Sequence, residues 1–233
     1  MQKNLSELET KIKTKFKNKD LLRTALTHRS YLNENRSYNL PQNERLEFLG
    51  DAVLELITTE YLYNKFEKPE GELTNLRAAL VNHRILSRVG HQIALQEHIL
   101  MSRGEAKDTG RARDIILANA VEALIGAIYL DGGREAAQKF IERFILTELD
   151  GIMERQSYVD PKSRLQEIVQ EEISVTPVYR VITESGPDHD KRFVVGVMVE
   201  KKQIGKGSGP SKRDAEVAAA ENALETKKFE KLY

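Results

Sequence analysis

The sequence predicts a mainly α-helical protein, in which an all-helical domain is followed by a small α+β domain of order α-β-β-β-α. Apolar residues recur at spacings of three and four through most of residues 1–150, as on one face of a helix. Beyond residue 155, three short runs rich in β-branched residues alternate with turn residues, and a helical pattern stands on either side of them. We therefore expect a helical domain over 1–153, a linker over 154–159 and the α+β domain over 160–229.

The composition is that of a folded protein, with 40% hydrophobic and 31% charged residues among 233. Lys and Arg number 36 and Asp and Glu also number 36, so any nucleic-acid site must be a local cationic patch. Cysteine is absent, which excludes disulfides, thiolate zinc sites and a catalytic cysteine.

Neither a targeting segment nor a membrane span is expected. Residues 1–20 are too polar for a signal peptide. The most apolar stretch, residues 115–130, is interrupted by Asn119 and Glu122 and is too short to cross a bilayer. We expect a soluble protein of the cytoplasm.

Five helical patterns fill the first domain, over residues 21–32, 43–66, 73–95, 114–130 and 134–152. Asn43 is suited to cap the second of them, and Gly132 and Gly133 to end the fourth. Two long loops are expected, over residues 34–42 and 102–113.

The second domain opens with a helix over 161–172, begun by Pro161. Strands are expected over 178–185, 192–200 and 201–207, and a final helix over 211–229. Residues 201–213 carry five Lys or Arg and no acid, which makes a local cationic edge in an otherwise neutral chain.

Four acids line one side of the helix expected over 43–66: Glu44, Glu47, Asp51 and Glu55. At about 100° per residue they fall on a stripe about 80° wide, and no Lys or Arg shares it. Like charges four residues apart mildly destabilise a helix. The stripe is either a solvated face or a face that holds a cation.

The helix over 114–130 contains a single ionisable residue after Asp114, Glu122, with Asn119 one turn before it. A helix that is apolar all round is buried, and an unpaired buried carboxylate is costly. Either a basic side chain of another helix neutralises Glu122, or a divalent cation does so and is shared with the acidic stripe. Oxygen ligands suit Mg²⁺ or Mn²⁺, and metal-activated water would hydrolyse a phosphodiester.

The segment NERLEFLGDAVLEL, residues 43–56, resembles the signature of the ribonuclease III family. ALTHRS before it and ILANAVEALIGAIYLDGG after it are similar to two further blocks of that family, in the same order. The segment over 160–229 resembles a double-stranded-RNA-binding domain. The resemblance implies a homodimeric endoribonuclease that uses Mg²⁺, or Mn²⁺ in its place, and no organic cofactor. It would cut duplex RNA to 5′-phosphate and 3′-hydroxyl ends with short 3′ overhangs.

The resemblance also implies roles for single residues. Glu47, Asp51 and Glu122 match the family's metal-binding acids, and Asp51 and Glu122 are expected to be direct ligands. Asn119 stands where the family usually has Asp. Its oxygen can still orient a metal-bound water, but one negative charge is lost, so we expect weaker metal binding than with Asp.

Other residues of the family blocks are expected near the catalytic valley or the dimer interface. Glu44 and Glu70 match further acids of this region, and Glu44 is included among the catalytic residues. Phe48 and Leu49 match core and interface positions. His28 is interpreted as structural.

Three surfaces of the second domain are expected to grip duplex RNA through its grooves and phosphates. Gln166 and Glu167 stand on the first helix, and His189 stands in the turn over 186–190, which Pro187 stiffens. Ser211, Lys212 and Arg213 stand at the start of the last helix. Glu216 occupies a position of this cluster that can be cationic in the family.

The sequence thus predicts an endoribonuclease acting on duplex RNA, with ribosomal and messenger RNA precursors as substrates. Two alternatives are left open. One is a family member that binds duplex RNA without cutting it because of Asn119. The other is a helical dimer with a structural role, whose acidic stripe faces a basic protein.

Overall fold

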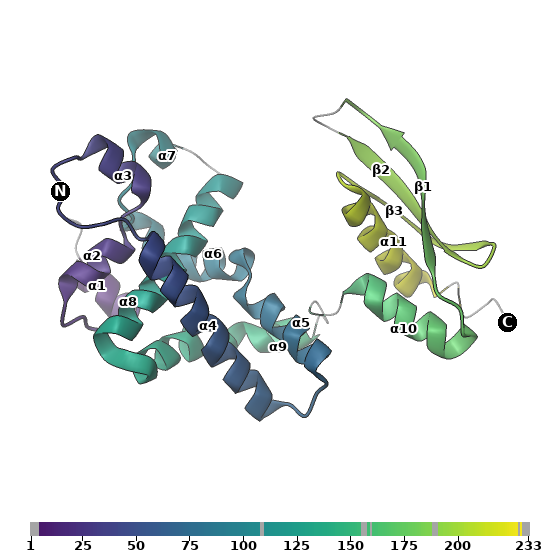
Figure 1. Cartoon of the computed structure of the whole chain (residues 1–233), viewed down its shortest axis with the longest axis horizontal. Coiled ribbons are helices and arrows are strands. Elements are labelled where there is room, and N and C mark those ends of the chain that lie inside the picture. The colour runs from purple at the N-terminus through teal and green to yellow at the C-terminus, as the bar shows by residue number, and fades with distance from the viewer. Residues whose placement is uncertain are drawn as a thin grey trace. The chain divides into compact units, whose positions relative to one another are not determined.

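A computed structural model describes residues 5–107, 110–154, 158, 160–187, 191–227 and 229. The chain divides into two compact units, Met1–Tyr158 and Val159–Tyr233. The first is helical and the second combines a sheet with helices (Figure 1). This is the mainly α architecture, with a terminal α-β-β-β-α unit, that the sequence predicts. Most of the predicted linker, residues 155–157 and 159, lies outside the described residues, so the exact domain boundaries stay a prediction.

The helices of the first unit are α1 (Leu5–Lys11), α2 (Lys19–Ala25), α3 (Arg29–Glu34), α4 (Glu44–Lys65), α5 (Glu70–Val81), α6 (His83–Gln92), α7 (Arg103–Lys107), α8 (Arg111–Phe144) and α9 (Leu149–Glu154). Two 3₁₀ turns, η1 (Leu95–Glu97) and η2 (Leu146–Glu148), join them. The predicted helix over 43–66 is α4. The predicted helix over 114–130 lies in α8, which kinks at Gly133, where φ is +74°. The helix predicted over 134–152 is not continuous, since it is divided among the end of α8, η2 and α9.

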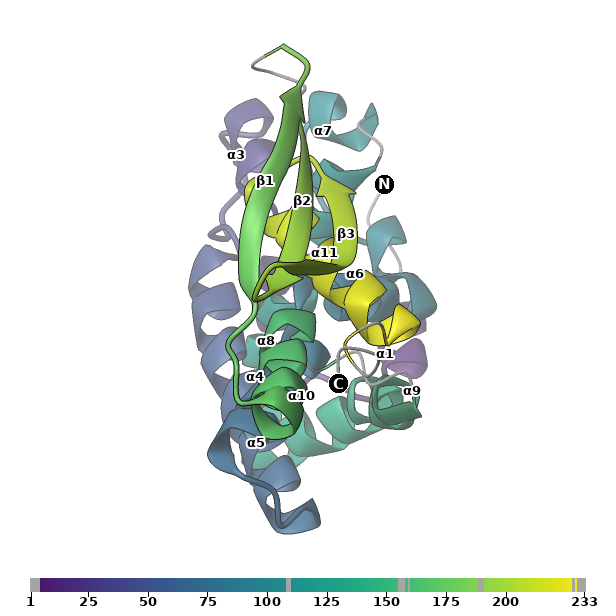
Figure 2. The same ribbon diagram turned by 90° about the vertical axis from the view of Figure 1, so that its right-hand side faces the viewer.

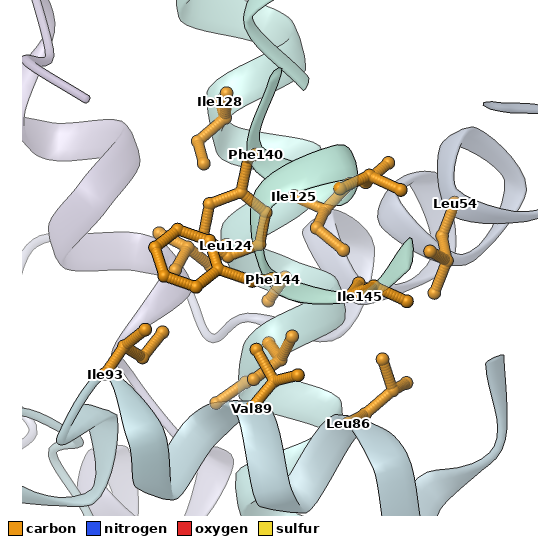
Figure 3. Close-up of a cluster of buried hydrophobic side chains, with 14 of the residues drawn as sticks. Leu54, Leu86, Val89, Ile93, Leu124, Ile125, Ile128, Phe140, Phe144 and Ile145 are labelled. Atoms are coloured by element: carbon orange, nitrogen blue, oxygen red, sulfur yellow. The ribbon is translucent and has the colours of Figure 1, made fainter. Parts of the chain in front are cut away.

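One hydrophobic core holds this unit together, with α8 at its centre. Figure 3 shows side chains on either side of the kink in α8 converging with those of α4 and α6. The rings of Phe140 and Phe144 lie 5.0 Å apart, centre to centre, in a tilted arrangement. Because residues 116–128 of α8 are almost all buried, the side chains that interrupt the apolar pattern there are held in fixed positions.

Two helices predicted as continuous are broken by polar caps. The segment over 21–32 is interrupted at Thr27 and His28, and His28 caps α3 by accepting a hydrogen bond from the Ser30 amide. The segment over 73–95 is interrupted at Asn82, whose side chain accepts from the amides of Arg84 and Ile85 at the start of α6. These predictions of continuous helices were wrong because both breaks fall inside unbroken apolar periodicity. This capping contact supports the structural interpretation of His28, which stays a prediction.

The predicted loop over 102–113 also needs correction, since it contains α7 and the start of α8. Its first residues are fastened to α3, because the Ser102 amide donates to Ser30 Oγ at 3.0 Å. At the other end of the unit, Asp131 accepts hydrogen bonds from the amides of Lys17 and Asn18, each at 2.8 Å. The carboxylate that follows the apolar part of α8 therefore anchors the loop between α1 and α2.

In the described residues, the helical stretch Ala112–Glu154 is long and apolar enough to span a membrane by length and composition alone. The sequence analysis considered only residues 115–130 and judged them too short to cross a bilayer, whereas the helical stretch in the structure is longer. More than half of its most apolar window is buried inside the fold. Burial against neighbouring helices accounts for this apolar character.

The second unit consists of α10 (Pro161–Ile173), β1 (Val178–Ser185), β2 (Arg192–Val199), β3 (Lys202–Gly209) and α11 (Lys212–Thr226). The strands form an antiparallel sheet in the order β1-β2-β3. Helix α11 runs along one face of this sheet (Figure 1 and Figure 2). Val195, Val197 and Ile204 of the sheet are buried with Leu165 and Val169 of α10.

Strand β3 alternates glycine with polar residues because α11 lies against it. A Cβ atom on Gly205, Gly207 or Gly209 would come within 2.4, 2.2 and 2.6 Å of an atom of the chain over 214–223. The residues of α11 that pack against these glycines include Ala215, Ala219 and Ala223, all of which are buried. The glycines are therefore a packing surface, and residues 205–209 belong to a strand and not to a flexible turn.

Replacing Gly207 by Ala is expected to destabilise the second unit by about 1–3 kcal/mol, because the added methyl group would collide with the backbone of α11. Differential scanning calorimetry of the full chain measures the change. Gly71→Ala is the control, since nothing lies within 4 Å of a Cβ at that position. Equal behaviour of the two variants would contradict this account of β3.

Candidate active site

Two glycines let helices α4 and α8 cross with their backbones in contact. A Cβ atom on Gly50 would lie 1.8 Å from the carbonyl oxygen of Glu122, and one on Gly126 would lie 2.3 Å from that of Leu46. No side chain fits between the two helices at this crossing. The residues that flank the glycines on each helix are therefore brought side by side.

The crossing brings Glu47 of α4 beside Asn119 of α8. The Asn119 side chain hydrogen-bonds to the Glu47 carboxylate, which favours the ionised form. Burial opposes this, as do the negative charges of Glu44 and Asp51, and the net effect is a pKa for Glu47 above its ordinary value. Asn119 thus acts in the structure as a hydrogen-bond donor to a neighbouring acid.

Glu122 is the most perturbed acid of the group. Burial raises its pKa to about 7, and the nearby charges of Asp51 and Glu47 add to the effect. No ion pair to Glu47, Asp51 or Glu122 exists within the described part of the chain. A basic partner on another helix, one of the two interpretations of the sequence, is therefore not found among those residues, and the charge of Glu122 is left uncompensated.

The predicted metal ligands are Glu47, Asp51, Asn119 and Glu122. The charges of the acids raise the pKa values of Glu47 and Glu122, but the side chains do not converge on one point. Across the described residues, no three His, Asp or Glu side chains lie close enough together to hold a metal ion. Repulsion among the carboxylates favours such a separation. The assignment of these residues as ligands stays a prediction.

Among the described residues, Glu44 differs from the other acids of its stripe because it has a basic partner. It lies 3.7 Å from the Arg29 guanidinium and accepts a hydrogen bond from Gln42 at 2.9 Å. The structure does not bring Glu70 into this group. Glu70 begins α5 and lines a pocket of about 470 Å³ between α4 and α5, together with Tyr63 and Arg77.

An apolar stripe runs along α4 beside the acids. Phe48 is 81% exposed, Leu56 55% and Tyr63 74%. Leu49 is half-buried against the core, so only Phe48 of this pair is available to another molecule. At about 100° per residue, Phe48, Leu56 and Tyr63 fall within about 80° of one another, next to the acidic stripe.

The predicted RNA-binding residues that the structure describes are exposed. Gln166 and Glu167 stand on α10, and Lys212 and Arg213 on the first turn of α11. Ser211 caps α11 by accepting a hydrogen bond from the Asp214 amide at 3.1 Å. His189 lies outside the described residues. The roles of all these residues in RNA binding stay predictions.

Glu216 has a structural partner. Its carboxylate is 2.5 Å from Lys162 Nζ, which also lies 4.7 Å from the centre of the Tyr179 ring. The ion pair ties α10 to α11, the two helices that present the predicted RNA-binding residues. An acid at this position is therefore explained without a contact to RNA.

Comparison with protein families matches both units. Residues 18–149 match the family model described as "Ribonuclease-III-like", and residues 161–227 match the "Double-stranded RNA binding motif". The chain belongs to the ribonuclease III family. It is thus an endoribonuclease that acts on double-stranded RNA.

Curated relatives and solved structures agree with this assignment. The chain is 46% identical to "Ribonuclease 3" of Desulforamulus reducens over 94% of its own length and 90% of the relative's. It is 45% identical to "Ribonuclease 3" of Streptococcus pneumoniae, over 95% and 97%. A nuclease-domain structure of ribonuclease III from Campylobacter jejuni matches with a TM-score of 0.56 and 43% identity, over 62% of this chain and 97% of that one. Its title names a region "involved in dimer formation".

Gly50 and Gly126 are the residues of this site that the sequence analysis missed. The available signal was their position, since each is a glycine inside a long helix, where glycine is unfavourable unless packing requires it. Gly50 also lies between Glu47 and Asp51. The two unfavourable glycines therefore indicated where the helices that carry the acids pack closely together.

The raised pKa of Glu122 predicts a specific pH dependence of stability. Between its ordinary value of 4.5 and about 7, the folded chain holds a proton that the unfolded chain has released. The free energy of unfolding therefore falls as pH rises through this window. Thermal unfolding of the full chain in EDTA should show this fall, and Glu122→Gln should reduce it. Added Mg²⁺ should restore stability most at the alkaline end.

The exposed Glu172→Gln serves as the control for removal of a carboxylate. If Glu122→Gln has the same pH profile as the wild-type chain, Glu122 does not carry an uncompensated charge.

Proposed function

We propose that this member of the ribonuclease III family is a divalent-metal-dependent nuclease that works as a homodimer. It cuts duplex RNA to 5′-phosphate and 3′-hydroxyl ends with short 3′ overhangs, and its substrates are precursors of ribosomal RNA and structured messenger RNAs in the cytoplasm. The observation that carries the proposal is that Glu47, Asp51 and Glu122 lie near enough at the crossing of α4 and α8 to raise the pKa of Glu122, without a basic partner in the described residues.

The donor set fits Mg²⁺, or Mn²⁺ in its place. Three carboxylates and one amide oxygen are hard oxygen ligands of the kind these ions prefer. The raised pKa of Glu122 shows an acid whose ionised form lacks a compensating charge, which a divalent cation would supply. Glu47, Asp51 and Glu122 would hold the ion, with Asp51 and Glu122 as direct ligands. When bound, it would activate water and stabilise charge on the phosphate.

The chain's own residues hold this donor set in place. Asn119 orients the Glu47 carboxylate through its hydrogen bond, and burial limits the movement of Glu122. Arg29 partly offsets the charge of Glu44, so this acid can stay at the edge of the site. Because the helix backbones touch, the spacing between the two pairs of ligands is set by the fold.

The exposed stripe of Phe48, Leu56 and Tyr63 supports dimerisation. Apolar side chains this exposed are characteristic of a surface that another protein covers. If two copies pair through this stripe, two-fold symmetry places the acidic stripe of each copy next to the dimer interface. Phe48 and the pocket that Glu70 lines would then belong to the same interface, and the acids of both copies would flank one valley that serves both strands of an RNA duplex.

The second unit supplies the grip on RNA. The amides at the start of α11, with Lys212 and Arg213 exposed beside them, favour phosphate. Gln166 and Glu167 can reach the 2′-hydroxyls of a minor groove, and His189 belongs to the predicted second minor-groove contact. The alternative of a family member that binds without cutting is not favoured, because Glu47, Asp51 and Glu122 are all present.

The deciding experiment is a cleavage assay on a long, fully paired RNA and its single-stranded control, with Mg²⁺ and with EDTA. We expect cutting of the duplex alone, only with metal, into short products with 5′-phosphates. A duplex that stays intact but is retarded on a native gel would mean a binding protein.

Replacing Asn119 by Asp adds a negative charge to the donor set and removes the amide donor to Glu47. We expect the variant to reach half-maximal cleavage at a several-fold lower Mg²⁺ concentration. A titration of Mg²⁺ in the cleavage assay measures this. A variant no more active than wild type at limiting Mg²⁺ would show that the position does not limit metal binding.

Replacing Lys212 and Arg213 together by Ala is expected to weaken duplex binding and to lower the slope of log affinity against log salt by about 2, one for each lost phosphate contact. Fluorescence anisotropy over a range of salt concentrations measures both. The matched control is Lys201→Ala with Lys202→Ala, which removes two cations at the β2–β3 turn. Equal slopes for the two double variants would exclude Lys212 and Arg213 from the RNA site.

A further inference from the structure

The sheet of the second unit has a face without a helix. Phe193, Val195, Val197 and Val199 of β2 are buried on the side of the helices, so Val194, Gly196 and Met198 point to the other side. Their partners across the strands share that side: Thr183 and Ser208 with Val194, Arg180 and Lys206 with Gly196, and Val178 and Gln203 with Met198. We call these residues, together with Ile182, the free sheet face.

Aliphatic side chains are exposed on the free sheet face. Val178 is 53% exposed and Ile182 46%. The irregular pairing of β1 between Val181 and Thr183 turns Ile182 over β2, where its Cδ1 atom lies 3.0 Å from the place a Cβ on Gly196 would take. Ile182 therefore lies across the middle of the face, near Met198 and Val194, and forms an apolar centre.

The charged side chains that flank this centre in the described strands are cations. Arg180 and Lys206 flank Gly196 from the two outer strands, and both are exposed with no ion pair in the described residues. Arg192 stands further along the same face, opposite Ser185. The one carboxylate within the three strands, Glu184, pairs with Phe193 on the other side and lies 3.2 Å from Lys191.

The proposed RNA-binding residues that the structure describes belong to the helices and not to this face, and His189 belongs to the predicted turn between β1 and β2. Gln166 and Glu167 stand on α10, and Lys212 and Arg213 at the start of α11, which packs on the opposite side of the sheet (Figure 2). Duplex RNA gripped by these residues leaves Arg180 and Lys206 without a role. Their positive charges and the exposed aliphatic side chains between them call for a different ligand.

We propose that the free sheet face is a docking site for an acidic protein segment that also carries aliphatic side chains. The charge of the face selects an acidic partner, and its apolar centre supplies the area that becomes buried on binding. RNA fits less well, because the face has no aromatic side chain on which a base could stack and its centre offers nothing to a phosphate. A partner docked here can be held while the helices grip RNA.

A binding experiment on the full, ¹⁵N-labelled chain tests this with a defined probe. The probe is a synthetic amphipathic helical peptide with Glu on one face and Leu on the other. One control peptide has Lys in place of Glu, and another has Ser in place of Leu. We expect only the Glu and Leu peptide to shift the amide signals of Val178, Ile182 and Met198.

Variants of the chain then separate this surface from the RNA site. Arg180→Glu with Lys206→Glu should weaken binding of the Glu and Leu peptide by about tenfold or more. Lys201→Glu with Lys202→Glu, at the neighbouring turn, is the control and should bind the peptide as the wild type does. Affinity for duplex RNA and the rate of cleavage should not change in the Arg180 and Lys206 variant.

Four outcomes would overturn the proposal. The proposal fails if the signals of Val178, Ile182 and Met198 do not shift, or if the Ser-containing peptide binds equally well. Either result would mean that the peptide is attracted only by unspecific charge interactions. Loss of RNA affinity in the Arg180 and Lys206 variant would assign the face to RNA, whatever the activity of the α4–α8 site. A changed molecular mass of that variant in light scattering would make it an interface between copies of this chain.

Discussion

The backbone contact between α4 and α8 is the constraint on which the catalytic unit depends. Gly50 and Gly126 allow two long helices to touch where any larger residue would separate them. The same crossing carries the acids, since Glu47 and Asp51 flank one glycine and Glu122 lies one turn before the other. Stability and chemistry therefore depend on the same residues, and the fold tolerates repulsion between the half-buried carboxylates of Glu47 and Glu122 and the exposed one of Asp51 because they form the site.

Much of the fold could be predicted from periodicity, because α4, α8 and the three strands each repeat one pattern over many residues. The breaks at His28 and Asn82 could not, since the apolar spacing continues through them and only a local hydrogen bond ends the helix. For the site, Glu122 could be singled out as a charge in an apolar helix. Its closeness to Glu47 and Asp51 was one of two interpretations left open by the residues and was favoured by the family resemblance, because no pattern within one helix specifies the partner it crosses.

Small residues serve both units, in two different ways. In the first, single glycines allow one close crossing between helices. In the second, glycines at every other position of β3 leave one face of the strand without side chains, so the alanines of α11 can pack closely against it. Sequence reasoning recognised neither, because glycine in isolation indicates turns or flexibility, whereas here it marks contact. The strand pattern also frees the opposite side chains, Lys206 among them, to face solvent.

The crossing has a consequence for the timescale on which the site moves. Parts of a protein open independently, and the slowest to open are those buried within the core. Since the backbones of Gly50 and Gly126 lie in that core, the acids beside them cannot rearrange unless the helical unit unfolds. Their side chains can change rotamer, but the backbone positions that carry them stay fixed. Adaptation to RNA duplexes of different shape must therefore come from the second unit and from exposed side chains, while the cutting geometry stays constant from one substrate to the next.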